Sequence, residues 1–219
     1  MRVVLISTYE LGRQPFGLGS PAAWLREAGA DVTCVDVSRQ ALPEDTVRGA
    51  DLIAFHVPMH TATRLAVALL PTVRELNAHA KLCFYGLYAS VNEAYLRGLG
   101  VDFIIGGEFE EPLAALVANL SLSNGKGSSS DIKAQRYPLR VAPGNGRSEQ
   151  RPYGERADAA SISLGRQKFR VPDRSGLPPL EKYARLLMPD GESRVTGYTE
   201  ASRGCKHLCR HCPIVPVYN

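Results

Sequence analysis

The strongest constraint on the fold is a regular alternation of apolar runs and helical segments across residues 1–120. Each apolar run is short and nearly continuous and ends in small or polar residues, which is typical of a strand buried on both faces. Between the runs, apolar residues recur at the spacing of an amphipathic helix. The predicted strands are 2–7, 31–36, 51–56, 81–85 and 102–105. The predicted helices are 17–30, 61–77, 92–99 and 111–120.

Strands that alternate with helices predict an α/β fold with a five-stranded, doubly wound parallel sheet. Sheets of this kind bind ligands beyond the carboxyl ends of their strands. The loops expected at those ends span 7–19, 56–61, 86–92 and 106–111. No GxGxxG follows the first strand and the chain has no GxxxxGK[ST]. The standard dinucleotide fingerprint is therefore missing, and a P-loop is excluded.

Residues 121–176 differ in composition from the rest of the chain. They include a Ser- and Gly-rich run at 121–130 and carry 11 basic and 5 acidic side chains. Few positions there can contribute to a core, so we predict a flexible basic linker. Clustered arginines can also bind nucleic acid, but aromatic interleaving and helical spacing are missing. We therefore favour a solvated linker and expect no nucleic-acid partner.

No apolar run approaches the ~20 residues of a membrane-spanning helix, and the first residues lack a signal-peptide core. We therefore expect a cytoplasmic protein with no membrane partner.

The cysteines fall into two groups. In a reducing compartment, cysteines fill cores, bind metals or act in catalysis. Cys34 and Cys83 lie alone in apolar runs, whereas Cys205, Cys209 and Cys212 lie within one short stretch near residue 219.

The second group forms a CxxxCxxC motif. Three thiolates on one short loop can hold three corners of a cubane 4Fe-4S cluster and leave the fourth iron open to a substrate. The same thiols could instead form a three-Cys, one-His zinc site with His207 or His211. A zinc ribbon normally uses paired CxxC motifs, so the spacing favours the cluster, and both readings stay open.

The residues around this motif resemble those of a known family. Ser202-Arg203-Gly204 followed by CxxxCxxC resembles the cluster loop of radical S-adenosylmethionine (SAM) enzymes. Residues 177–180, with Tyr183 after them, resemble the segment that leads from a cobalamin-binding domain into the radical SAM barrel. Residues 86–89 and 101–110 resemble the end of that cobalamin domain. The stretches 9–15, 59–64 and 197–201 resemble the group of CUAEP/CCAEP-tail radical SAM proteins.

The resemblance implies three regions: a Rossmann/flavodoxin-like cobalamin-binding domain over 1–120, the linker over 121–176, and the lead-in and cluster loop of a truncated radical SAM barrel over 177–219. It implies that the motif cysteines hold a 4Fe-4S cluster that chelates SAM and, on receiving one electron, cleaves it to a 5′-deoxyadenosyl radical. The electron would come from a donor such as a flavodoxin or a ferredoxin, and the substrate would be a small molecule or a peptide. The implied cobalamin contacts are Gly86, Leu87, Tyr88, Ala89, Gly106, Gly107 and Glu108.

Two departures from the family pattern matter. There is no DxHxxG motif, so no histidine is placed as the lower axial ligand of cobalt, and we interpret His56 and His60 as loop residues. A radical SAM barrel needs ~200 more residues than follow Cys212 here, so we expect the chain to be a fragment that does not catalyse alone. The alternative is a non-catalytic cobalamin-type α/β domain with a zinc-binding C-terminal loop.

Overall fold

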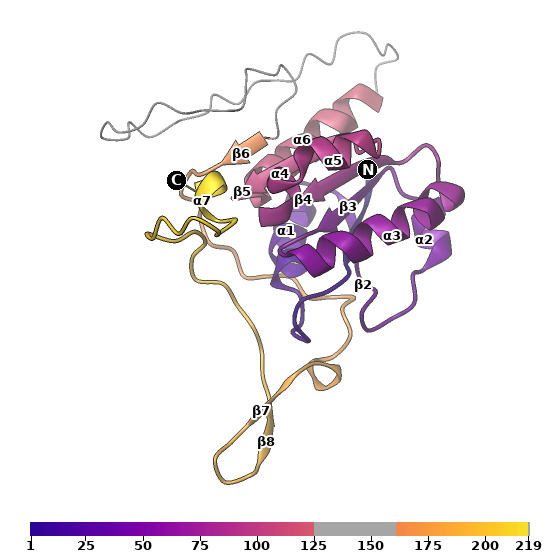
Figure 1. The fold of residues 1–219 in the computed structure, drawn as a ribbon. Helices are drawn as coiled ribbons and strands as arrows, with labels where there is room; N and C mark the ends of the chain where they lie inside the picture. Colours follow the sequence, from indigo (N-terminus) through magenta and orange to yellow (C-terminus); the bar gives the residue numbers. More distant parts are fainter. Residues whose placement is uncertain (125–160, 219) are drawn as a thin grey trace.

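The computed structural model describes residues 1–124 and 161–218, and its centre is a parallel β-sheet with helices on both faces (Figure 1). The six strands stand in the order β2-β1-β3-β4-β5-β6. Neighbouring strands run parallel in every pair, from β1–β2 to β5–β6. The strands are β1 (Arg2–Ser7), β2 (Asp31–Asp36), β3 (Leu52–His56), β4 (Lys81–Tyr85), β5 (Phe103–Gly107) and β6 (Ser161–Ser163).

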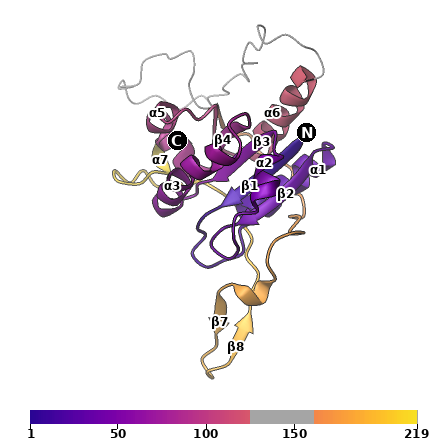
Figure 2. The ribbon, with the colours of Figure 1, turned by 90° about the vertical axis from the view of Figure 1, so that its right-hand side faces the viewer.

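The helices form two layers (Figure 2). Side chains alternate between the faces of a strand, so Val3 and Leu5 of β1 face one layer and Val4 and Ile6 face the other. The first layer contains α1 (Phe16–Glu27) and α6 (Glu110–Asn124). The second contains α2 (Glu44–Arg48), α3 (His60–Leu76), α4 (Leu87–Val91) and α5 (Glu93–Gly98). Both faces of the sheet are therefore apolar and covered.

The predicted α/β fold with a parallel sheet is confirmed, but the prediction of five strands is wrong. The sixth strand, β6, pairs Ile162 with Gly106 of β5 and lies inside the range that we predicted as linker. Its sequence, Ser-Ile-Ser, is too short to form an apolar run, and the edge of β5 determines its conformation. Residues 125–160 of that range lie outside the described residues.

Two local differences concern helices. The helix predicted over 92–99 is confirmed as α5, but the preceding stretch, predicted as the loop 86–92, contains the further short helix α4. The two helices meet at Asn92, whose side-chain amide donates to the Tyr88 carbonyl of α4 (2.8 Å). The short helix α2 was not predicted; its Val47 is fully buried against the second layer. One apolar residue in five shows no helical period, so the pattern could not indicate α2.

After β6 the chain follows the carboxyl edge of the sheet as a C-terminal segment, residues 164–218. The Asp173 amide donates to the Gly19 carbonyl (2.9 Å) and the Ala184 amide to the Gly12 carbonyl (2.7 Å). This segment contains the 3-10 turn η1 (Leu180–Lys182), the antiparallel strands β7 (Arg185–Leu187) and β8 (Ser193–Val195), and α7 (Val215–Tyr218). The β7–β8 hairpin extends away from the sheet (Figures 1 and 2). The start of a radical SAM barrel at 177–219 stays a prediction.

Among the described residues, no helix combines the length and the apolar character that crossing a bilayer requires.

The packing of α1 against β3 gives a test of the fold. A Cβ atom added at Gly17 would lie 2.1 Å from Cε1 of the buried His56 ring, whereas a Cβ at Gly98 of α5 would meet no atom within 4 Å. We expect Gly17→Ala to lower the free energy of unfolding by about 1–3 kcal/mol through overpacking. The matched control Gly98→Ala should leave it unchanged or raise it by up to about 1 kcal/mol. Urea unfolding followed by circular dichroism measures both, and equal effects would contradict the described packing.

Candidate functional site

The candidate site lies at the carboxyl end of β5, where the C-terminal segment returns to the sheet just before its cysteines. Arg203 inserts its guanidinium among three carboxylates there. Nη1 and Nη2 donate to the two oxygens of Glu110, each at 2.7 Å, and Nη1 also donates to Glu108 at 2.9 Å. Nε donates to Glu200 at 2.8 Å. Only 14% of the Arg203 side chain and 4% of the Glu110 side chain are exposed, so the ion pair is largely shielded from solvent.

The sheet positions the acidic partners. Gly107 ends β5 with φ +68, a conformation that favours glycine, and the turn that follows directs Glu108 and Glu110 towards the edge. Glu110 is also the first residue of α6, where the helix dipole favours a negative charge. Ser20 of α1 donates to Glu110 Oε1 (2.7 Å), which holds the carboxylate from its other side. The guanidinium carbon of Arg203 lies 4.0 Å from the centroid of the Phe109 ring, in cation–π contact.

The two carboxylates of the sheet differ in their acid–base properties. Burial alone would raise the pKa of Glu110, but the hydrogen bonds and charge of Arg203, with the Ser20 hydroxyl, outweigh burial and hold that pKa below its ordinary value. Burial also acts on Glu108, and there it prevails over the opposing charge of Arg203, so the pKa of Glu108 is raised. The site therefore stabilises the ionised form of Glu110, whereas burial disfavours the ionised form of Glu108.

The cysteine loop, residues 205–212, follows Arg203 directly. Gly204 has φ +90, and a Cβ there would lie 3.1 Å from the ring of Tyr218, so the chain turns sharply against α7. Val217 of α7 is buried, and this short helix packs against α4 and β5. The loop is thus tied to the sheet domain at both ends, by Arg203 before it and by α7 after it.

The three thiols of the loop lie near the surface. Cys205 and Cys209 are exposed and Cys212 is half-buried. Across residues 1–124 and 161–218, no three His, Cys, Asp or Glu side chains are grouped closely enough to hold a metal ion. The donor set nevertheless fits a 4Fe-4S cluster in its chemistry, because it offers three accessible thiols and no carboxylate within the loop. Binding would require the loop to close so that the three sulfur atoms approach one another.

The residues implied as cobalamin contacts come together at the ends of β4 and β5, but the chain's own atoms fill the space beside the glycines. A Cβ at Gly106 would lie 2.5 Å from Ser90 Oγ, and one at Gly107 would lie 2.2 Å from the Ser163 carbonyl oxygen of β6. A Cβ at Gly86 would lie 3.3 Å from the His56 ring. Leu87, Tyr88 and Ala89 belong to α4, with Ala89 buried, and Glu108 binds Arg203. The chain itself therefore uses the space that the missing side chains leave at these glycines, and cobalamin contact at these residues stays a prediction.

His56 is predicted both as the last residue of the strand over 51–56 and as part of the loop over 56–61. The structure confirms the strand, because His56 ends β3 and only 2% of it is exposed. Its Nδ1 lies 3.3 Å from Glu10 Oε2, and its ring packs against Tyr85 and Phe109. Periodicity does not separate the last residue of a strand from the loop that follows it, so the sequence leaves both placements open for His56.

Sequence reasoning missed the roles of Ser20, Phe109, Glu110 and Glu200 at the Arg203 site. The Gly-Glu-Phe-Glu stretch of residues 107–110 marked only the end of a domain in the sequence. Two carboxylates at the end of a buried strand need a basic partner, so Glu108 and Glu110 could have indicated that an ion pair forms there. They could not identify Arg203, because the partner lies 93 residues after Glu110.

Comparison of the sequence with protein-family models matches none of them, and comparison with curated proteins finds no relative.

Replacing each sheet carboxylate by its amide tests the site. Glu110→Gln removes a firmly ionised partner of Arg203, so we expect the free energy of unfolding at pH 7 to fall by about 1–3 kcal/mol. Glu108→Gln removes a charge that burial disfavours, so we expect no change or a gain of up to about 1 kcal/mol. Urea unfolding at pH 7 measures the pair, and a loss of similar size in both variants would contradict the assignment.

The pH dependence follows from the same pKa shifts. The lowered pKa of Glu110 stabilises the fold above the unfolded value of about 4.3, and this contribution is lost as the pH falls through the folded pKa. The raised pKa of Glu108 acts oppositely: its contribution is present below about 4.3 and is lost as the pH rises through the folded pKa. Between pH 7 and pH 3, the stability difference between wild type and Glu110→Gln should therefore shrink. A constant difference would contradict it.

Proposed function

We propose that the chain supplies the α/β sheet domain and the cluster loop of a radical SAM enzyme, with Cys205, Cys209 and Cys212 as thiolate ligands of a 4Fe-4S cluster. The observation that supports this most is the position of the three thiols. They lie on one accessible loop that is tied at both ends to the carboxyl edge of a parallel sheet, the edge at which such sheets bind ligands.

The two groups of cysteines differ in a way that supports this choice of ligands. Burial raises the pKa of Cys34 to about 12, and it also raises the pKa of the fully buried Cys83. Both therefore stay protonated at neutral pH and do not compete for metal. The loop thiols are accessible, and the exposed cations Lys206 and Arg210 lie between them in sequence.

Bound by these thiols, a 4Fe-4S cluster supplies one-electron chemistry, which in the family that the loop resembles is the reductive cleavage of SAM to a 5′-deoxyadenosyl radical. The chain's own residues contribute position and charge. Arg203 fixes the entry of the loop against Glu110, and Gly204 provides the turn that brings Cys205 to the surface. The electron donor, such as a flavodoxin or ferredoxin, and a small-molecule or peptide substrate belong to this proposal as well.

Metal analysis tests the proposal. The full chain is reconstituted anaerobically with iron and sulfide, and separately with zinc, and its metal and sulfide contents are measured with the absorption spectrum. We expect about four irons and four sulfides per chain with a brown absorption near ~400 nm. The triple variant Cys205/Cys209/Cys212→Ala should lose both.

A double variant, His207→Ala with His211→Ala, separates iron from zinc. It should keep the cluster, because three thiols suffice for three corners of a cubane, whereas a three-Cys, one-His zinc site would lose its fourth ligand. Stoichiometric zinc that depends on these histidines, with no iron bound, would replace the proposal by the zinc-loop alternative.

Cobalamin binding is tested separately. Because His56, Ser90 and Ser163 fill the space beside Gly86, Gly106 and Gly107, we expect hydroxocobalamin not to co-elute with the full chain on gel filtration. Co-elution of about one cobalamin per chain would show that this edge opens, and would favour the cobalamin-binding domain that the resemblance implies.

A further inference from the structure

The carboxyl end of β5 has the chemistry of a receptor for a guanidinium group. We call Ser20, Glu108, Phe109 and Glu110 the guanidinium site. Two carboxylates accept hydrogen bonds, an aromatic ring offers its face, and a hydroxyl orients the more buried carboxylate. All four residues belong to the sheet domain. The group that occupies the site comes from the C-terminal segment, as Arg203.

The fit between the site and its occupant is specific to a planar fork. Two nitrogens of Arg203 donate to the two oxygens of Glu110 in parallel, and one of them also reaches Glu108. A lysine ammonium carries the same charge but cannot make this bidentate contact. The plane of a guanidinium also suits the contact with Phe109, at 4.0 Å from the ring centroid.

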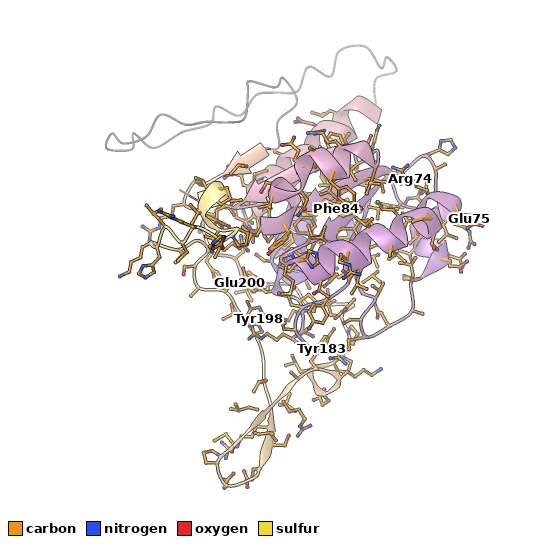
Figure 3. The ribbon with its side chains drawn as sticks, in the orientation of Figure 1. Arg74, Glu75, Phe84, Tyr183, Tyr198 and Glu200 are labelled. Atoms are coloured by element: carbon orange, nitrogen blue, oxygen red, sulfur yellow. The ribbon has the colours of Figure 1, made fainter. Side chains whose placement is uncertain are left out.

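We infer that the guanidinium site is the means by which the sheet domain holds the cysteine loop, and that Arg203 is a positioning residue for the metal bound there. Cys205 follows Arg203 by two positions, so displacement of the guanidinium moves the first thiol. Glu200, labelled in Figure 3, accepts from Nε at 2.8 Å and joins the preceding stretch to the same contact. The positioning of metal rests on the proposed function, whereas the docking of the loop does not.

The charge balance of the site makes the inference testable, because a small guanidinium compound can replace the Arg203 side chain once that side chain is removed. Three carboxylates surround one guanidinium, so the site stays anionic when the Arg203 side chain is removed. Removal also leaves room for a small cation of the same shape. Methylguanidinium matches the lost group in charge and in donor geometry, so it can occupy the site in trans.

The first experiment uses the metal-free full chain and its Arg203→Ala variant under limited trypsin digestion. Cleavage after Lys206 and Arg210 reports release of the loop, and cleavage after Arg194, in the exposed hairpin strand β8, is the internal reference. We expect Arg203→Ala to raise the loop rate about tenfold or more relative to the reference, because the buried Glu110 carboxylate loses its ionic partner. Millimolar methylguanidinium should restore slow cleavage. Tetramethylammonium, which has the charge but no N–H donors, should not.

Two further variants keep the test decisive. Arg203→Lys retains the charge without the fork, so its loop should be cleaved nearly as fast as in Arg203→Ala. Glu110→Gln damages the receptor instead of the occupant, so it should raise loop cleavage without any rescue by methylguanidinium. It also serves if Arg203→Ala does not fold. Wild-type cleavage rates in these variants would overturn the inference. So would fast cleavage of Arg203→Ala that methylguanidinium leaves unchanged while the circular dichroism spectrum is that of the wild type.

The second experiment follows the metal. After anaerobic reconstitution, Arg203→Ala should lose iron to a chelator about tenfold faster than the wild type and show an altered electron paramagnetic resonance spectrum when reduced, and methylguanidinium should reverse both. Equal iron loss in the two proteins would overturn the role in positioning metal and leave the docking result intact. If the wild type itself binds no iron, the proposed function fails, and the trypsin experiment still decides whether the guanidinium site holds the loop.

Discussion

The parallel sheet is apolar on both faces, and this constraint directs polar side chains to the ends of its strands. Ser7, Asp36 and His56 are the last residues of β1, β2 and β3, and all three are buried. Polar groups in such positions need partners or a cover that belongs to the chain. The C-terminal segment also lies along this edge, where Ala184 and Asp173 donate hydrogen bonds to the loop and the helix that follow β1.

At the carboxyl end of β5, the ion pair between Arg203 and Glu110 connects the C-terminal segment to the sheet. The Arg203 side chain is 14% exposed, so its charge is stable there only when carboxylates compensate for the lost hydration, and Glu110 does so from a position that is itself buried. The contact also joins three parts of the molecule. Ser20 of α1 binds Glu110, Glu108 lies just after β5, and Glu200 belongs to the segment before the cysteines. The placement of the cysteine loop depends on this junction and on the packing of α7.

The two groups of cysteines show how burial divides one residue type into two chemical roles. Cys34 of β2 and Cys83 of β4 pack in the core between the sheet and the first helix layer. Burial raises their pKa there, and they act as apolar core residues. The loop thiols have solvent and basic neighbours instead. Some glycines are likewise explained only by the fold. Gly17, Gly106 and Gly107 leave space that is used by His56, Ser90 and Ser163 of this chain, respectively. A sequence shows that a side chain is missing at such a position, but the neighbour that uses the space is known only from the fold.

The sequence by itself determined the strands β1 to β5, the main helices and the parallel sheet, because these follow from local apolar periodicity and from the alternation of element types. It also separated the core cysteines from the loop cysteines. Only the tertiary structure decided the sixth strand, the neighbours of the His56 ring and the partnership of Arg203 with Glu108 and Glu110. Each of these depends on residues that are distant in the chain and close in space. Local pattern carries no information on which distant carboxylate, strand edge or ring a residue will meet, so packing alone could decide them.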